Sequence, residues 1–280
     1  MISLERDSNK NLVEAKGIRQ ASWSWYNPHQ KKKFKISRSK FQDFLTCPKC
    51  FYFDRVMGLK APGMPGWTLN ETTDLLLKKE FDVCRESQTP HRLFTANGLE
   101  HLVPFKHPDM DRWRDALRGG LMIDYKTSNI TLSGGVDDVW QDTKTGKLII
   151  VDYKSQAKSG GVDIVDYLAD PYHESYKIQM DFYAYLLTAM GFPVDDKAYF
   201  LVCNADRNRN EFKGFLSFEE VLVPYVWNAD WIEPKVDEMI SLMKAHRLPE
   251  SHKSCQNCAY ARQFAELIPE ESDDPYDTFF

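Results

Sequence analysis

A membrane-spanning helix needs about 18 or more consecutive apolar residues, and no run in this sequence approaches that length. The first residues, MISLERD, contain no apolar segment of the kind that forms the centre of a secretory signal. These two absences lead us to expect a cytoplasmic protein that makes no membrane contact.

An excess of positive charge is also missing. The chain has 36 Lys and Arg residues against 41 Asp and Glu residues, which gives a formal net charge of −5. Bulk electrostatics therefore does not indicate a nucleic-acid-binding protein, although an enzyme with a binding groove needs only local positive charge. The basic run at residues 31–40 is either such a phosphate-contacting segment or an ordinary solvated face.

The chain contains six cysteines among its 280 residues. In a cytoplasmic protein this usage favours metal binding or redox chemistry over disulfides. Four of the cysteines form two pairs, Cys47-Pro-Lys-Cys50 and Cys255-Gln-Asn-Cys258. The two pairs can supply four thiolates to one ion or cluster, which would join the two ends of a domain; four unliganded thiols are the alternative.

The most informative stretch is residues 133–156, SGGVDDVWQDTKTGKLIIVDYKSQ. Two extended runs, 135–142 and 147–155, flank a short polar connection with a glycine and predict a β-hairpin. Asp152 and Lys154 are two apart on the second strand and therefore point to the same side, where Asp137 of the first strand can approach them. Two adjacent carboxylates need a proton or a cation, and oxygen ligands suit Mg²⁺ or Mn²⁺. The alternative is a polar hairpin whose charges face water.

A second tripeptide of the same composition, Asp124-Tyr125-Lys126, precedes the hairpin. Only three apolar residues stand before it, and it comes before the Gly-Gly-Val-Asp segment. We interpret it as the end of a preceding, solvated strand.

Three motifs follow one another along the chain: Gly134-x-Val136-Asp137, Asp152-x-Lys154 and Gln179-x-x-x-Tyr183. In this order they resemble the PD-(D/E)XK nuclease superfamily, and within it the RecB-like exonuclease branch. Residues 41–59, FQDFLTCPKCFYFDRVMGL, resemble a second feature of that branch, in which a helix leads into Cys-Pro and an aromatic stretch.

The resemblance implies an α/β fold with a restriction-endonuclease-like core, a central mixed sheet flanked by helices, and a metal staple of cysteine pairs joining the N- and C-terminal regions. The alternation of strand and helix patterns agrees with this class. We expect an N-terminal extension over residues 1–36, a nuclease domain over 37–260, and an acidic tail over 261–280.

The resemblance also implies roles for single residues. Glu80, on a helix expected over 70–85, would hold the divalent ion together with Asp137, Asp152 and the backbone carbonyl of Tyr153. In the alternative, Glu80 leans to the helix edge and pairs with Lys78 or Arg85, and a histidine, His101 or His91, is the reserve ligand.

Lys154 would position the attacking water or stabilise developing charge. Gln179 and Tyr183 share one face of a helix expected over 174–190, and the resemblance implies that they contact nucleic acid or position catalytic groups. A core tyrosine beside a surface glutamine is the alternative.

For the cysteines, the resemblance points to a [4Fe–4S] cluster, which CRISPR-associated RecB-like exonucleases and some helicase–nuclease subunits hold by one early and three late cysteines. This sequence has two early and two late cysteines, so tetrahedral Zn²⁺ stays open beside [4Fe–4S].

We therefore predict a Mg²⁺- or Mn²⁺-dependent deoxyribonuclease with exonuclease-like action in DNA repair, recombination or defence. The sequence contains no helicase motor, so a larger nucleic-acid-processing complex would need a protein partner. The alternatives are a DNA-binding module that does not cleave and a structural metal-binding protein.

Overall fold

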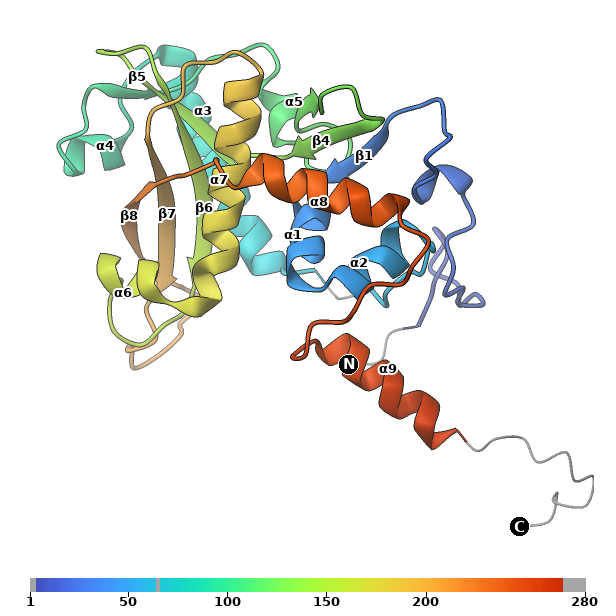
Figure 1. Ribbon diagram of the computed structural model, residues 1–280. Coiled ribbons are helices and arrows are strands. Elements are labelled where there is room, and N and C mark those ends of the chain that lie inside the picture. The colour runs from blue at the N-terminus through green and yellow to red at the C-terminus, as the bar shows by residue number, and fades with distance from the viewer. Residues whose placement is uncertain (1–3, 64–65, 269–280) are drawn as a thin grey trace, which may run out of the picture.

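The computed structural model describes residues 4–63 and 66–268, and it arranges them as two hydrogen-bonded sheets with helices on their faces (Figure 1). The predicted α/β class with helices flanking mixed β-structure is confirmed. The strands are divided between a three-stranded and a five-stranded sheet, whereas one central sheet was expected. Across the described residues, no helix is both long and apolar enough to cross a membrane.

The smaller sheet has the order β1-β4-β3, with β1 at Phe34–Ser37, β4 at Ile130–Gly134 and β3 at Leu121–Asp124. β1 runs parallel to β4, and β3 runs antiparallel to it. The boundary expected at residue 36 falls within β1, so the N-terminal segment supplies a strand to the core.

The larger sheet has the order β2-β5-β6-β7-β8. Its strands are β2 at Leu102–Pro104, β5 at Asp138–Asp142, β6 at Leu148–Gln156, β7 at Lys197–Ala205 and β8 at Phe218–Val226. β5 and β6 pair antiparallel with Asp138 opposite Val151, which confirms the predicted hairpin. Gly146 in the connection has a φ of 73°, a left-handed conformation that glycine adopts without strain.

Two long helices cover opposite faces around β6 (Figure 1). α3, Thr68–Ser87, contacts β2 and β6, and α7, Glu174–Ala189, contacts β3, β4 and β6. Side chains along β6 alternate between the two faces. Leu148 and Ile150 belong to the core under α7, while Ile149 and Val151 belong to the core under α3.

The remaining helices surround these layers: α1 at Arg38–Thr46, α2 at Pro48–Arg55, α4 at Arg92–Ala96, α5 at Met110–Arg114, α6 at Ile164–Ala169, α8 at Ile232–Lys244 and α9 at Gln256–Leu267, with short 3₁₀ turns at Ser22–Ser24 (η1) and Pro171–His173 (η2). α1 packs on α2, α7 and α8. α9 stands apart from the sheets in Figure 1. It extends into the expected acidic tail, whose residues 269–280 lie outside the described part of the chain.

Candidate active site and thiolate cluster

The C-terminal half of β6 carries a buried carboxylate and a lysine on the face covered by α7. Asp152 is fully buried. Its Oδ1 accepts a hydrogen bond from Nε2 of Gln179 at 2.6 Å, and its Oδ2 is paired with Nζ of Lys154. The Lys154 ammonium also lies 4.5 Å from the ring centroid of Tyr176. The lysine is thereby fixed from two sides.

Asp137 lies between β4 and β5 and approaches the same point. Its Oδ2 accepts a hydrogen bond from the backbone N–H of Tyr153 at 2.8 Å. Burial raises the pKa of Asp152 to about 7, and the charge of Asp137 adds to this effect while Lys154 opposes it. The two carboxylates are therefore close enough to repel each other, as the hairpin pattern predicts.

Gln179 and Tyr183 lie one turn apart on α7 and are both buried. Nε2 of Gln179 contacts the Tyr183 hydroxyl at 3.0 Å in addition to Asp152. The glutamine is therefore no surface residue. Gly134 passes so close to Tyr183 that a Cβ at this glycine would lie 2.5 Å from the ring. This close approach explains why a glycine precedes Val136 and Asp137 in the motif.

Glu80 is not brought to this pair of carboxylates. Its Oε1 lies 2.5 Å from Nε of Arg92 and 3.2 Å from Nε2 of His91, and its side chain is 40% exposed. His91 itself is buried and stacks on Phe81. Glu80 is thus at the helix edge in an ion pair, although its partner is Arg92 in place of the expected Lys78 or Arg85.

Asp74, for which no motif predicts a role, is the acidic residue of α3 that lies near Asp137. Nζ of Lys78 is 2.8 Å from Oδ2 of Asp74 and 3.9 Å from Oδ1 of Asp137. Burial raises the pKa of Asp74, the hydrogen bond from Lys78 opposes this, and the charge of Asp137 adds to it.

Helical geometry could have identified Asp74. At 3.6 residues per turn, Asp74 lies about 20° around the helix from the buried Phe81, whereas Glu80 lies about 100° from it. Asp74 therefore faces the sheet on the centre of the apolar stripe.

A buried ion network supports the site from the face covered by α3. Asp138 is completely buried, and its Oδ1 lies 2.5 Å from Nη2 of Arg85 and 3.0 Å from Nη2 of Arg114. Its Oδ2 accepts a hydrogen bond from the Tyr153 hydroxyl at 2.8 Å. Asp138 begins β5 and points into this network, whereas Asp137, just before the strand, accepts from the backbone N–H of Tyr153 beside Asp152. In the sequence, two consecutive aspartates at the start of a predicted strand could have indicated this network.

The four predicted cysteine ligands come together between α2 and α9. Their sulfur atoms all lie within 4.8 Å of one another, and all four thiols are free of disulfides. Individual Sγ–Sγ distances are 3.4 Å for Cys50–Cys258, 3.5 Å for Cys50–Cys255 and 3.8 Å for Cys47–Cys258. Within the described part of the chain, no other group of three or more His, Cys, Asp or Glu ligand atoms is gathered this closely.

Comparison with known proteins adds an independent finding. A model of the PD-(D/E)XK nuclease superfamily matches residues 67–263, a segment that contains α3, the hairpin, α7 and the second cysteine pair. No curated protein matches the chain. A crystal structure from Eubacterium rectale, provisionally named an exonuclease, is 13% identical, with 92% of this chain and 97% of that chain covered and a TM-score of 0.40.

Proposed function

Because the chain belongs to the PD-(D/E)XK nuclease superfamily, we propose that it hydrolyses phosphodiester bonds of DNA in a divalent-metal-dependent, exonuclease-like reaction that serves repair, recombination or defence. The observation that carries the proposal is the junction of Asp137, Asp152 and Lys154 beside the buried Gln179. Motif order alone would not require these side chains to meet.

The donor set at this junction fits Mg²⁺ or Mn²⁺. Two carboxylates lie together, one of them fully buried, and hard oxygen ligands are those that both ions prefer. We assign Asp137, Asp152 and the backbone carbonyl of Tyr153 as ligands, with Asp74 as the candidate from α3. The role of Glu80 as a ligand stays a prediction that no contact supports. When bound, the ion would polarise the scissile phosphate and lower the pKa of a water molecule.

Side chains of the protein position the carboxylate ligand, the attacking water and the nucleic acid. Gln179 holds Oδ1 of Asp152 and so fixes the direction of the carboxylate. Lys154, held by Asp152 and Tyr176, presents its ammonium to the attacking water or to the charge that develops on the phosphate. The hydroxyl of Tyr183, positioned by Gln179, orients the nucleic-acid strand.

The test is cleavage of 5′-end-labelled single- and double-stranded DNA, with RNA of the same sequence alongside, in Mg²⁺, Mn²⁺ or EDTA. The parent protein is compared with Asp152→Asn, and Asp124→Asn serves as the matched control because Asp124 belongs to the second Asp-Tyr-Lys tripeptide. We expect cleavage of DNA that needs the divalent ion, disappears in Asp152→Asn and persists in Asp124→Asn.

The product ladder distinguishes the mode of action, because stepwise shortening from one end indicates an exonuclease. Retention of DNA without cleavage would contradict the nuclease proposal and favour a binding module. Cleavage that persists in Asp152→Asn would overturn the assignment of the site.

For the four cysteines we propose a single tetrahedral Zn²⁺ that joins α2 to α9. With a Zn–S distance of about 2.3 Å, the sulfur atoms of a regular tetrahedron lie about 3.8 Å apart. Three of the Sγ–Sγ distances, 3.4, 3.5 and 3.8 Å, are near that spacing, and none of the others exceeds 4.8 Å. In a [4Fe–4S] cluster each thiolate binds a different iron, which requires the sulfurs to stand farther apart.

Elemental analysis of protein purified without oxygen tests this assignment. One zinc per chain without acid-labile sulfide is expected, and Cys255→Ser should lose the metal. Iron together with acid-labile sulfide would show that the four cysteines bind a [4Fe–4S] cluster.

A further inference from the structure

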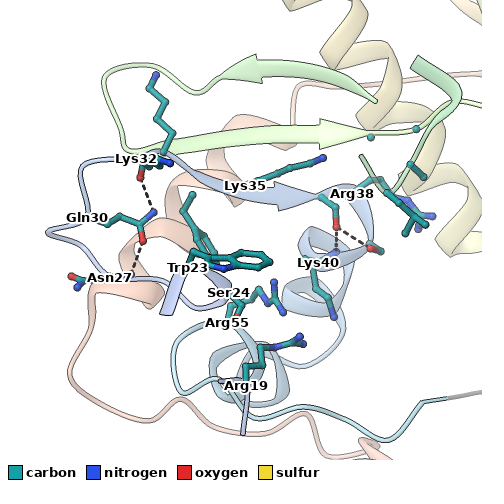
Figure 2. A pocket seen from close by; sticks show the side chains of 18 of the residues that line it. Arg19, Trp23, Ser24, Asn27, Gln30, Lys32, Lys35, Arg38, Lys40 and Arg55 are labelled. Carbon is teal, nitrogen blue, oxygen red and sulfur yellow. Dashed lines mark hydrogen bonds between the residues drawn. The ribbon is translucent and has the colours of Figure 1, made fainter. Parts of the chain in front are cut away.

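A groove of about 990 Å³ lies between the N-terminal segment, β1 and the start of α1. Eight of its lining residues are Lys or Arg, and none of them is Asp or Glu. Figure 2 shows basic side chains such as Lys35, Arg38 and Lys40 around it. In a protein with a net charge of −5, a groove lined by one sign of charge concentrates an anionic ligand at this place.

Part of this positive charge has no acidic partner. Lys31 and Lys32 are exposed, and neither forms an ion pair with a residue that the structure describes. The Arg38 guanidinium donates a hydrogen bond at 2.7 Å to the side-chain oxygen of Gln42, which carries no charge. These three residues are therefore free to neutralise phosphates.

Three other basic side chains of the groove are held in place by one carboxylate. Asp54, with 15% of its side chain exposed, pairs with Lys40 at 2.9 Å and with Arg55 at 2.8 Å, and it also pairs with Arg19. One carboxylate thus orders three cations and neutralises only one of them.

Two residues beside the candidate active site line the groove. They are Gly134 and Tyr183, and Tyr183 is linked through Gln179 to the buried Asp152. Burial raises the pKa of Tyr183, and the positive charge of Arg38 is the main opposing influence. Arg38 and Tyr183 also line the same groove, so the groove holds positive charge together with this tyrosine.

Trp23 marks the groove as a site for unpaired bases. It lies in η1 on the groove wall, and 80% of the residue is exposed (Figure 2). An exposed aromatic face beside cationic side chains is how proteins stack a base of single-stranded nucleic acid. In a duplex the base faces are covered by their neighbours, so Trp23 has no such partner there.

The residues that form the groove come mainly from outside the segment that matches the superfamily. Trp23, the basic residues and the start of α1 all precede residue 67, whereas Gly134 and Tyr183 lie within the match. The groove is thus a feature that the N-terminal segment of this chain adds to the nuclease core.

We propose that this groove binds single-stranded DNA, with Lys31, Lys32 and Arg38 on phosphates and Trp23 stacked on a base, and that it leads the strand to Asp152 and Lys154. The inference rests on the proposed nuclease function, since that function supplies the reason for a path to the site.

Binding is measured with every protein in the Asp152→Asn background, so that no probe is cut. The probes are a fluorescein-labelled oligothymidylate, a DNA hairpin duplex and an RNA of the same length. Trp23→Ala should weaken binding of the oligothymidylate about tenfold, which is the loss of one stacked base, and leave duplex binding unchanged. Trp67→Ala is the control, because Trp67 is 70% exposed and does not line the groove.

The salt dependence of binding tests the phosphate contacts. For single strands each neutralised phosphate contributes about 0.7 to the slope of log K against log salt, so Lys31→Ala with Lys32→Ala should lower the slope by about 1.4. Lys144→Ala, a substitution in the exposed hairpin turn, should leave the slope unchanged.

Unaltered oligothymidylate binding in Trp23→Ala and in the double lysine variant would overturn the proposal, and so would a preference for the duplex or the RNA. The two proposals fail separately. If the parent cleaves DNA with a divalent ion but the groove variants bind normally, only the groove proposal is contradicted. If Trp23→Ala loses binding and the parent never cleaves, the groove proposal stands and the nuclease proposal is contradicted.

Discussion

The chain contains the same tripeptide twice, and the two copies have different surroundings. Asp152-Tyr153-Lys154 lies on β6, which has hydrogen-bonded neighbours on both sides, whereas Asp124 ends the edge strand β3 and is followed by Tyr125 and Lys126. The Asp152 side chain is completely buried, while 59% of the Asp124 side chain is exposed.

The lysines differ in the same way. Lys154 is 17% exposed and lies between Asp152 and the Tyr176 ring. Lys126 is 49% exposed and pairs with Glu233 and Asp237 of α8, each at 3.1 Å. The predicted preceding strand is present, and its end is solvated at Asp124 and Lys126, whereas Tyr125 is buried in the core. Identical sequence gives a candidate catalytic group only where the sheet buries its carboxylate beside a second one.

The largest expected difference between the two copies is in cleavage. Lys154→Ala removes the group that orients water or stabilises developing charge, and such a loss lowers the rate by roughly 10²–10³-fold. Lys126→Ala removes exposed ion pairs and a contact with the Tyr125 ring, both far from Asp152, and should change the rate less than about twofold. Initial rates on end-labelled DNA in Mg²⁺ measure both.

Both variants must be compared at equal folded fraction, which circular dichroism verifies. Equal rates for Lys154→Ala and Lys126→Ala would mean that the burial of the tripeptide on β6 has no catalytic meaning.

The tyrosines of the two tripeptides, Tyr153 and Tyr125, should contribute differently to the free energy of unfolding. The Tyr153 hydroxyl donates to Asp138, a completely buried carboxylate, so Tyr153→Phe should cost about 2 kcal/mol, as expected for a hydrogen bond to a buried charge. The Tyr125 hydroxyl donates to Asp237, whose side chain is 55% exposed and can turn to water, so Tyr125→Phe should cost about 1 kcal/mol. Urea unfolding of both variants measures the two losses, and an equal or reversed order would contradict this reading of the Asp138 network.

Much of this arrangement follows from local sequence rules. The alternation of faces along β6 places Asp152 and Lys154 together, and the four-residue spacing on α7 places Gln179 above Tyr183. These two predictions depend on a short repeat or on one turn, which the sequence displays directly. The gathering of the four cysteines joins two pairs far apart in the chain, and it was predicted because one ion or cluster takes four thiolates.

The misplaced acidic residue of α3 had a different cause. Several acidic residues occur along this helix, and the choice of Glu80 treated the edge of the apolar stripe as its centre. The helical period alone places Asp74 near the centre of the stripe, whereas its distance from Asp137 depends on how α3 lies across β6. The division into two sheets and the groove at Trp23 likewise arise from segments far apart in the chain.

The smallest expected effect concerns Asp124 and its dependence on pH. The pKa of Asp124 is held below its usual range, chiefly by the hydrogen bond from Lys33 and next by that from the Thr131 hydroxyl. A lowered folded-state pKa contributes stability that is present above the unfolded value of about 3.9 and is lost as the pH falls through the folded value. Thermal unfolding of the parent and Asp124→Asn should therefore show a small advantage for the parent at pH 7 that closes below about pH 4. A gap that stays constant down to pH 3 would show that the Asp124 carboxylate makes no charge-dependent contribution, so that the two tripeptides would differ at the aspartate in burial alone.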